Sequence, residues 1–315
     1  MPLLVCANVH SNPTLALTPG SATIEPGKTY SFTATVTKQG GGAPSKSVPV
    51  SVKVEVDPTS GGHDHGETYA KRDKGTVSPA TGTNSFPITF SSTEVSGTHT
   101  ITATCDLCSN STETATVYVK VEGLKPIPAF PYYALEEADP DNPGETKVIG
   151  ATGLHSSNHN LLPAAAQVLM RIAVKYRFDP KFKVLDWQTN KMVPPPPLYV
   201  NDASLKWGGK FDIHGAWTGS HAEHKRGTSV DLRANENVGA IPPELFDKFE
   251  ERLMEIIPGD TAGKKFLREC TPNEQPTESN PNPVQHNRKP RNYCVSQVDG
   301  SFDANRHYHV RLLGE

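Results

Sequence analysis

Residues 229–233 read Ser-Val-Asp-Leu-Arg, and residues 307–312 read His-Tyr-His-Val-Arg-Leu. Both stretches have the short, apolar-rich character of a β-strand. Because the side chains of a strand alternate between its two faces, His307 and His309 share one face and the tyrosine between them lies on the other. If the two strands are neighbours in a sheet, Asp231 faces the same point in space as His309.

The loop before the first of these strands adds a further histidine to the group. His224 and Asp231 are separated by six residues, and Gly227 between them allows the connection to turn tightly. His224, Asp231 and His309 offer three nitrogen or oxygen ligands, and His307 is left over. Three protein ligands with an open fourth position are typical of a catalytic zinc site. The helical HExxH signature of zinc peptidases is absent from the sequence.

The order and spacing of these motifs resemble the LAS family of peptidoglycan metallopeptidases. This family groups lysostaphin-type endopeptidases, D-alanyl-D-alanine peptidases and penicillin-insensitive murein endopeptidases. Its hallmark is H-x6-D followed much later by H-x-H, which corresponds here to His224 and Asp231, then His307 and His309. The likeness is greatest to the murein endopeptidase branch, through Gly-Ser-His-Ala-Glu-His at residues 219–224, and it covers at most the last half of the chain.

The resemblance implies a zinc-dependent hydrolase that cleaves amide bonds in the peptide crosslinks of peptidoglycan. By the family pattern, His224, Asp231 and His309 bind Zn²⁺. His307 is then the catalytic histidine, placed to transfer protons beside the metal. The bond that is cleaved does not follow from the sequence.

Three further residues are candidates for contacts around this site. His221 is expected to touch the substrate or to support a metal ligand, with an ordinary surface histidine as the alternative. Arg306 and Arg311 flank the H-x-H motif, where they are candidates for binding substrate carboxylates. An ordinary surface role is the alternative for each arginine.

Two other functions remain open. A D,D-carboxypeptidase or dipeptidase on the same zinc scaffold would need a closed pocket with a clamp for a free carboxylate. A secreted, non-enzymatic binding protein would keep the zinc for structure alone. The spare His307 speaks against this last function, because a structural zinc site closes its fourth position with a protein ligand.

The first part of the chain has a different character, and the protein is therefore predicted to be multidomain. Apolar and polar residues alternate over residues 30–36, 50–56 and 115–121, among other runs. Such period-two runs, bounded by Gly, Pro, Ser and Asn, are typical of half-buried antiparallel strands. Roughly seven strands of this kind predict an all-β, immunoglobulin-like sandwich over residues 1–122, which we expect to be a spacer or adhesion module.

A proline-rich linker is predicted over residues 123–145, followed by the zinc peptidase domain over residues 146–315. Apolar residues recur at helical spacing in residues 161–178 and again in residues 243–257. Strand-like stretches lie between these helices and after them. The pattern predicts an α+β domain with the helices on one side of an antiparallel sheet.

Composition predicts an exported protein, periplasmic or extracellular. The 315 residues carry 31 basic and 34 acidic side chains, for a net charge of −3, which gives no electrostatic reason to expect nucleic acid as a partner. No stretch approaches the roughly 18 apolar residues that span a membrane. The first seven residues are too short for a signal peptide, so we expect either that a leader is missing from this chain or that its start is misassigned. The sequence carries no signal of oligomeric state.

The five cysteines suit an oxidising compartment. Cys270 and Cys294 bracket a polar loop and are predicted to form a disulfide. Cys105 and Cys108 are close enough in sequence to bind a metal or to pair across a turn, and the disulfide is favoured. Cys6 is left over, or pairs with one of these two.

Overall fold

The computed structural model divides the chain into two compact units. Residues 1–122 and 209–218 make up the first unit, and residues 123–208 and 219–315 make up the second. The residues that the structure describes are 12–62, 73–138, 146–148, 158–213, 216–218, 222–233, 241–242, 245–259, 265–269 and 307–314.

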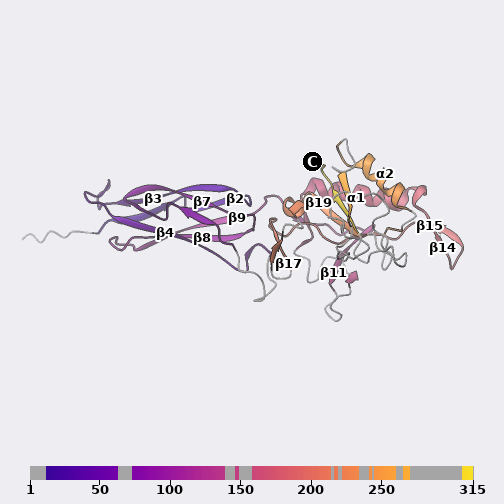
Figure 1. Ribbon diagram of the computed structural model, residues 1–315, viewed down its shortest axis with the longest axis horizontal. Coiled ribbons are helices and arrows are strands. Elements are labelled where there is room, and N and C mark those ends of the chain that lie inside the picture. The colour runs from indigo at the N-terminus through magenta and orange to yellow at the C-terminus, as the bar shows by residue number, and fades with distance from the viewer. Residues whose placement is uncertain are drawn as a thin grey trace, which may run out of the picture. The chain divides into compact units, whose positions relative to one another are not determined.

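The first unit is a β-sandwich (Figure 1). Its strands are β1 (Thr14–Thr18), β2 (Ser21–Ile24), β3 (Thr29–Thr37), β4 (Pro49–Val56), β5 (Thr76–Ser78), β6 (Thr81–Thr83), β7 (Ser85–Ser91), β8 (Gly97–Thr104) and β9 (Thr112–Val119). One sheet has the order β1-β3-β7-β5 and the other the order β2-β9-β8-β4-β6. Neighbouring strands are antiparallel except for β2 and β9, which are parallel. The predicted all-β sandwich is confirmed.

The period-two pattern of the sequence becomes the inner face of this sandwich. In β4, Val50, Val52 and Val54 are buried and the residues between them are exposed. These valines share one core with Phe32 of β3 and Phe90 of β7, which belong to the other sheet. Apolar side chains from both sheets therefore exclude water from a common interior, which is the main source of stability of such a fold.

A disulfide joins Cys105 and Cys108 in the turn between β8 and β9. Both residues are buried, and the Cys108 backbone N–H donates to the Cys105 carbonyl oxygen at 3.2 Å. The favoured prediction for this pair is confirmed, and these two sulfur atoms are not available to a metal. Cys6, Cys270 and Cys294 lie outside the described residues.

A hairpin from late in the chain belongs to the first unit. It consists of β17 (Phe211–Ile213) and β18 (Ala216–Thr218). Gly209 forms a β-bridge with Val95, and the side chains of Lys210 and Glu94 form an ion pair at 3.2 Å. The second unit therefore does not take up all of residues 146–315, because the chain passes into the first unit and returns shortly before His224.

The second unit is built around a six-stranded sheet with the order β12-β11-β16-β19-β21-β20. Its elements are β10 (Lys125–Pro126), β11 (Tyr133–Ala138), β12 (Thr146–Val148), β13 (Asn160–Leu161), α1 (Pro163–Phe178), η3 (Pro180–Phe182), β14 (Val184–Asp186), β15 (Lys191–Val193), β16 (Leu198–Val200), η4 (Ala222–Arg226), β19 (Ser229–Arg233), α2 (Phe246–Ile256), β20 (Phe266–Glu269) and β21 (His307–Arg311). The strand pairs are antiparallel except for β11 and β16, so the sheet is mixed and not purely antiparallel as predicted. The long connection through α1 provides the crossover that parallel neighbours require.

The start of this unit corrects the predicted linker. Residues 123–138 supply β10, which pairs with β13, and β11, which lies inside the sheet. Tyr133 and Leu135 of β11 are buried in the core. This strand is hard to recognise in the sequence, because it has too few apolar residues to show a period of two. Prolines and acidic residues surround it, and they are typical of a linker.

The two predicted helices are present and share the core of the sheet. Leu169 of α1 and Phe249 of α2 are buried together with Val230 of β19 and Tyr308 of β21. The rings of Phe249 and Tyr308 lie 5.4 Å apart, and the Tyr308 hydroxyl donates to Glu250 at 2.9 Å. The face of the sheet that carries Tyr308 is therefore the helical face. Neither helix is long and apolar enough to cross a lipid bilayer, and the same holds for every helix in the described ranges.

Tyr133 gives a test of the packing of β11. Its hydroxyl donates to the Pro128 carbonyl oxygen, and burial raises the pKa of Tyr133 to about 12. An unfolded tyrosine has a pKa near 10, so the folded state binds the proton more tightly. The contribution of the protonated Tyr133 hydroxyl to stability is complete below about pH 10 and is lost as the pH rises towards about 12. We expect the free energy of unfolding, measured by denaturant titration, to fall over this range in the wild type more than in Tyr133→Phe. Parallel curves for the two proteins would contradict the buried position of this hydroxyl.

Candidate metal centre

Strands β19 and β21 are direct antiparallel neighbours, as the sequence predicts. Asp231 and His309 lie opposite each other in the register, and Arg233 lies opposite His307. Since Tyr308 lies on the helical face, alternation places Asp231, His307 and His309 together on the opposite face. The pairing of two strands that are far apart in the chain thus brings the two halves of the motif together.

The three predicted ligands converge on one buried point. Asp231 Oδ1 lies 2.8 Å from His309 Nδ1 and 3.1 Å from His224 Nε2. The candidate ligand atoms of the three residues all lie within 4.8 Å of one another, and none of the residues is more than 5% exposed. A tetrahedral zinc ion with bonds of about 2.0–2.2 Å holds its ligand atoms about 3.3–3.5 Å apart. The ligand atoms that lie 2.8 and 3.1 Å apart would therefore move slightly apart around such an ion.

His224 is oriented by the turn that follows it. It lies in η4, and the Gly227 backbone N–H donates to its carbonyl oxygen at 3.1 Å. The His224 Nδ1 atom lies 3.2 Å from the carbonyl oxygen of Ser229, which can only accept a hydrogen bond. Nδ1 therefore carries a proton, and Nε2 is the ring nitrogen that faces Asp231. Metal-binding histidines are typically fixed by an acceptor of this kind on the nitrogen that faces away from the ion.

His307 differs from the other two histidines in position and exposure. Its Nε2 atom lies 3.6 Å from Asp231 Oδ2. The other two histidines lie closest to Oδ1 of the same carboxylate. Its side chain is 19% exposed, compared with 6% for His309. His307 is also outside the group of mutually close ligand atoms. The residue that the sequence leaves over is thus beside the group and partly exposed to solvent.

Charges around Asp231 keep its carboxylate ionised. Burial by itself would raise the pKa of Asp231, but the positive charges of His224 and His307 oppose this effect. Hydrogen bonds from His224 and His309 act in the same direction, and together they hold the pKa of Asp231 well below its usual value. A carboxylate must be deprotonated to bind a metal, so Asp231 has the charge state that a ligand needs.

The structure describes one of the three accessory candidates. Arg311 lies on β21 opposite Ser229, on the same face as His309, and is 8% exposed. Its low exposure leaves little of it for contact with a substrate, so that role stays a prediction. His221 and Arg306 lie outside the described residues.

Two residues that the sequence patterns did not point to hold the backbone of Asp231. The Asn201 N–H donates to the Asp231 carbonyl oxygen at 2.8 Å, and the Asp231 N–H donates to the Asp202 carbonyl oxygen at 2.7 Å. The signal that could have found them is the interruption of the apolar alternation after Val200, where two polar residues follow in succession.

Gly227 provides a test of the turn between the two motif residues. Its φ angle is +66°, and an added Cβ would lie 3.2 Å from Leu162 N, 3.3 Å from Leu161 Cα and against the side chain of Leu124. We expect Gly227→Ala to lower the free energy of unfolding by about 1–3 kcal/mol and to weaken zinc binding, because the turn positions His224. The control is Gly123→Ala, which shares a positive φ of +82° but has its nearest neighbour at 3.6 Å. Equal zinc affinity in both variants, measured by competition with a chromogenic chelator, would contradict this role of the turn.

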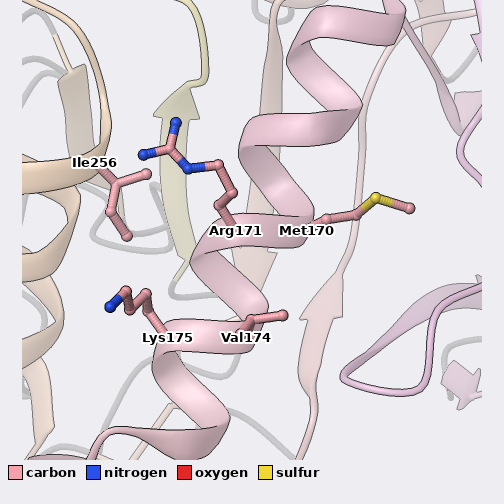
Figure 2. Close-up of a pocket in the computed structure, with 5 residues that line it drawn as sticks. All are labelled: Met170, Arg171, Val174, Lys175 and Ile256. Carbon is pink, nitrogen blue, oxygen red and sulfur yellow. The ribbon is translucent and has the colours of Figure 1, made fainter.

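A separate pocket lies on the helical layer (Figure 2). It has a volume of about 220 Å³ and is lined by Met170, Arg171, Val174, Lys175 and Ile256. Figure 2 shows Arg171 and Lys175 extending from α1 on the side of Ile256. None of the lining residues belongs to the group around Asp231, so this pocket is not part of the candidate metal centre.

Comparison with known proteins leaves the chain without an assigned family. No protein-family model matches it, and no curated protein matches it. Domains 4 and 5 of the S-layer protein SbsC are 20% identical to it, with a TM-score of 0.24, over 34% of this chain and 53% of that chain. The Yersinia pseudotuberculosis adhesin InvE is 16% identical, with a TM-score of 0.21, over 35% of this chain and 26% of that chain. At TM-scores this low, the similarity does not establish a shared fold or function.

Proposed function

We propose that the second unit is a zinc-dependent peptidoglycan hydrolase that cleaves amide bonds in peptide crosslinks. The observation that carries the proposal is the convergence of His224, Asp231 and His309 on one buried point, with His307 beside them. This grouping agrees with the ligand roles that the resemblance to LAS peptidases implies. The donor types, burial and mutual proximity of the three side chains support a metal site independently of that resemblance.

The donor set favours zinc among the common metals. Two imidazole nitrogens and one carboxylate oxygen suit zinc, which binds nitrogen and oxygen ligands in tetrahedral sites. Calcium and magnesium prefer sites made entirely of oxygen. The buried carboxylate of Asp231 would offset part of the charge of the ion, and His224 and His309 would complete the protein ligands.

The residues around the ion have separable tasks in the proposed reaction. Zinc in such a site supplies Lewis acidity towards a carbonyl oxygen and lowers the pKa of water to about 7. His307 accepts a proton from the attacking water through its imidazole and returns it to the leaving amine, because it is the most exposed of the three described histidines of the site. Asp231 holds His307 in place by its charge, at 3.6 Å from Nε2.

We also propose that the protein acts outside the cytoplasm. The Cys105–Cys108 disulfide supports this location, because disulfides persist in oxidising compartments. A peptidoglycan substrate requires the same location. The first unit would then serve as a spacer or adhesion module that keeps the hydrolase near the wall.

The two alternative functions predict different products. A D,D-carboxypeptidase would release free D-alanine without breaking crosslinks. A binding protein with a structural zinc would release nothing. The position of His307 outside the ligand group is unfavourable to a structural site, because such a site closes its fourth position with a protein ligand.

Digestion of purified sacculi tests the three functions together. We expect the zinc-loaded protein, at roughly one ion per chain, to convert crosslinked muropeptide dimers to monomers, as measured by mass spectrometry. A strong chelator should abolish this conversion and added zinc should restore it. Release of D-alanine with intact dimers would indicate the carboxypeptidase. Full zinc content with no product would indicate a structural metal and would contradict the proposal.

A further inference from the structure

The segment after β16 departs from regular strand alternation next to the metal centre. Leu198, Val200 and Ala203 are all buried in the core of the second unit. A regular strand would place one residue between consecutive core positions, but two residues, Asn201 and Asp202, separate Val200 from Ala203. One residue is therefore extra, and both intervening side chains are directed away from the helical core.

The backbone hydrogen bonds identify this irregularity as a β-bulge. Asn201 N–H donates to the carbonyl oxygen of Asp231, and the N–H of Asp231 donates to the carbonyl oxygen of Asp202. Two residues thus oppose the single residue Asp231, which defines a bulge. Asn201 Nδ2 donates to Asp202 Oδ2 at 3.1 Å, so the two side chains lie together. The bulge therefore directs the carboxylate of Asp202 to the face of the sheet that carries Asp231.

Amide groups hold the Asp202 carboxylate in place without neutralising it. Its Oδ1 atom accepts from Asn158 Nδ2, and its Oδ2 atom accepts from Asn201 Nδ2. Both donors are uncharged, and within the described part of the chain no cation forms an ion pair with Asp202. Asp202 is partly buried, and its backbone carbonyl oxygen accepts from the N–H of the candidate ligand Asp231.

Asn158 contributes a second acceptor at the same place. The residue is 8% exposed, and its Oδ1 atom is buried with no hydrogen-bond partner among the described residues. A buried acceptor without a partner destabilises the folded protein, because it has lost its hydrogen bonds to water. Because Asn158 Nδ2 is bound to Asp202, its Oδ1 atom lies close to the same carboxylate.

We propose that Asp202 and Asn158 form a subsite for a primary ammonium group of the peptide substrate. An ammonium carries one positive charge and three donors and no acceptor, so it offsets the charge of Asp202 and satisfies Asn158 Oδ1. The subsite rests on the proposed hydrolase activity and adds a substrate class to it. The hydrolase selects peptides with a free amine near the amide bond that is cleaved, and it disfavours the same peptides when the amine is acylated.

A matched pair of substrates tests the subsite. Crosslinked muropeptide dimers with a free amine are compared with the same dimers after acetylation by acetic anhydride, which converts the ammonium to a neutral, bulkier amide. We expect the zinc-loaded wild type to prefer the free amine in kcat/KM by about 10- to 100-fold, the factor for a hydrogen bond to a charged group. Asp202→Asn keeps an acceptor for Asn158 and removes the charge. This variant should lose the preference because it cleaves the free-amine dimer more slowly, while its cleavage of the acetylated dimer and its zinc content stay unchanged.

The control is Asp186→Asn, which removes a partly buried carboxylate in the β14–β15 hairpin and should keep the full preference. Equal cleavage of both dimers by the wild type would overturn the subsite, as would a preference that survives in Asp202→Asn. If the wild type cleaves neither dimer, the proposed hydrolase fails, and calorimetric binding of the same two dimers then tests the subsite alone. Calcium binding that Asp202→Asn abolishes, with no preference between the dimers, would mean a metal site and would also overturn it.

Discussion

Replacement of His307 with alanine is expected to leave zinc bound and to lower the rate of hydrolysis by about 10²–10⁴-fold. His307 lies outside the group of mutually close ligand atoms and is the most exposed of the histidines around Asp231. Its loss therefore removes a proton-transfer group without removing a ligand. The decrease should appear in kcat, because proton transfer takes place in the transition state and contributes little to substrate binding.

Zinc content and kinetics on the same preparation separate the possible outcomes. His307→Gln is a useful companion variant, since it retains hydrogen bonding but cannot transfer a proton at neutral pH. Both variants should hold zinc as the wild type does. Loss of zinc from His307→Ala to the extent seen in a ligand variant would make His307 a fourth ligand. The site would then be closed, and a structural role for the metal would replace the proposed hydrolase.

Loss of the metal is the expected result of replacing either His224 or His309 with alanine. Each removes one of three protein ligands from a buried site whose ligand atoms lie within 4.8 Å of one another. Replacement of a residue that only supports a ligand typically lowers metal affinity by about 10–100-fold. Removal of a ligand itself should therefore lower the zinc affinity by more than about 100-fold. Elemental analysis after dialysis should find little zinc in either variant, and hydrolysis should disappear with it.

The matched control for these variants is Tyr308→Phe. Tyr308 lies beside His309 on β21 but faces the helices, where its hydroxyl donates to Glu250. This variant should keep its zinc and lose only the stability of one hydrogen bond, about 1 kcal/mol. Full zinc content in His224→Ala and in His309→Ala would refute the assignment of ligands.

The sequence determined those features that depend on local periodicity. Alternation placed His307 and His309 on one face of a strand, and the short loop with Gly227 placed His224 near Asp231. Period-two runs likewise predicted the sandwich of the first unit, and the apolar stripes predicted both helices. These patterns survive folding because each strand or helix buries one side against a core, and burial selects apolar residues at the period of the element.

Only the tertiary structure decided the features that depend on partners far apart in the chain. The pairing of β11 with β16 converts part of the predicted linker into a sheet strand, and the hairpin of β17 and β18 joins the first unit. The bulge at Asn201 and Asp202 is visible only through its bonds to Asp231. Short strands and single extra residues leave too few positions to show a period. Their conformation is fixed by hydrogen bonds to distant strands, which local sequence does not encode.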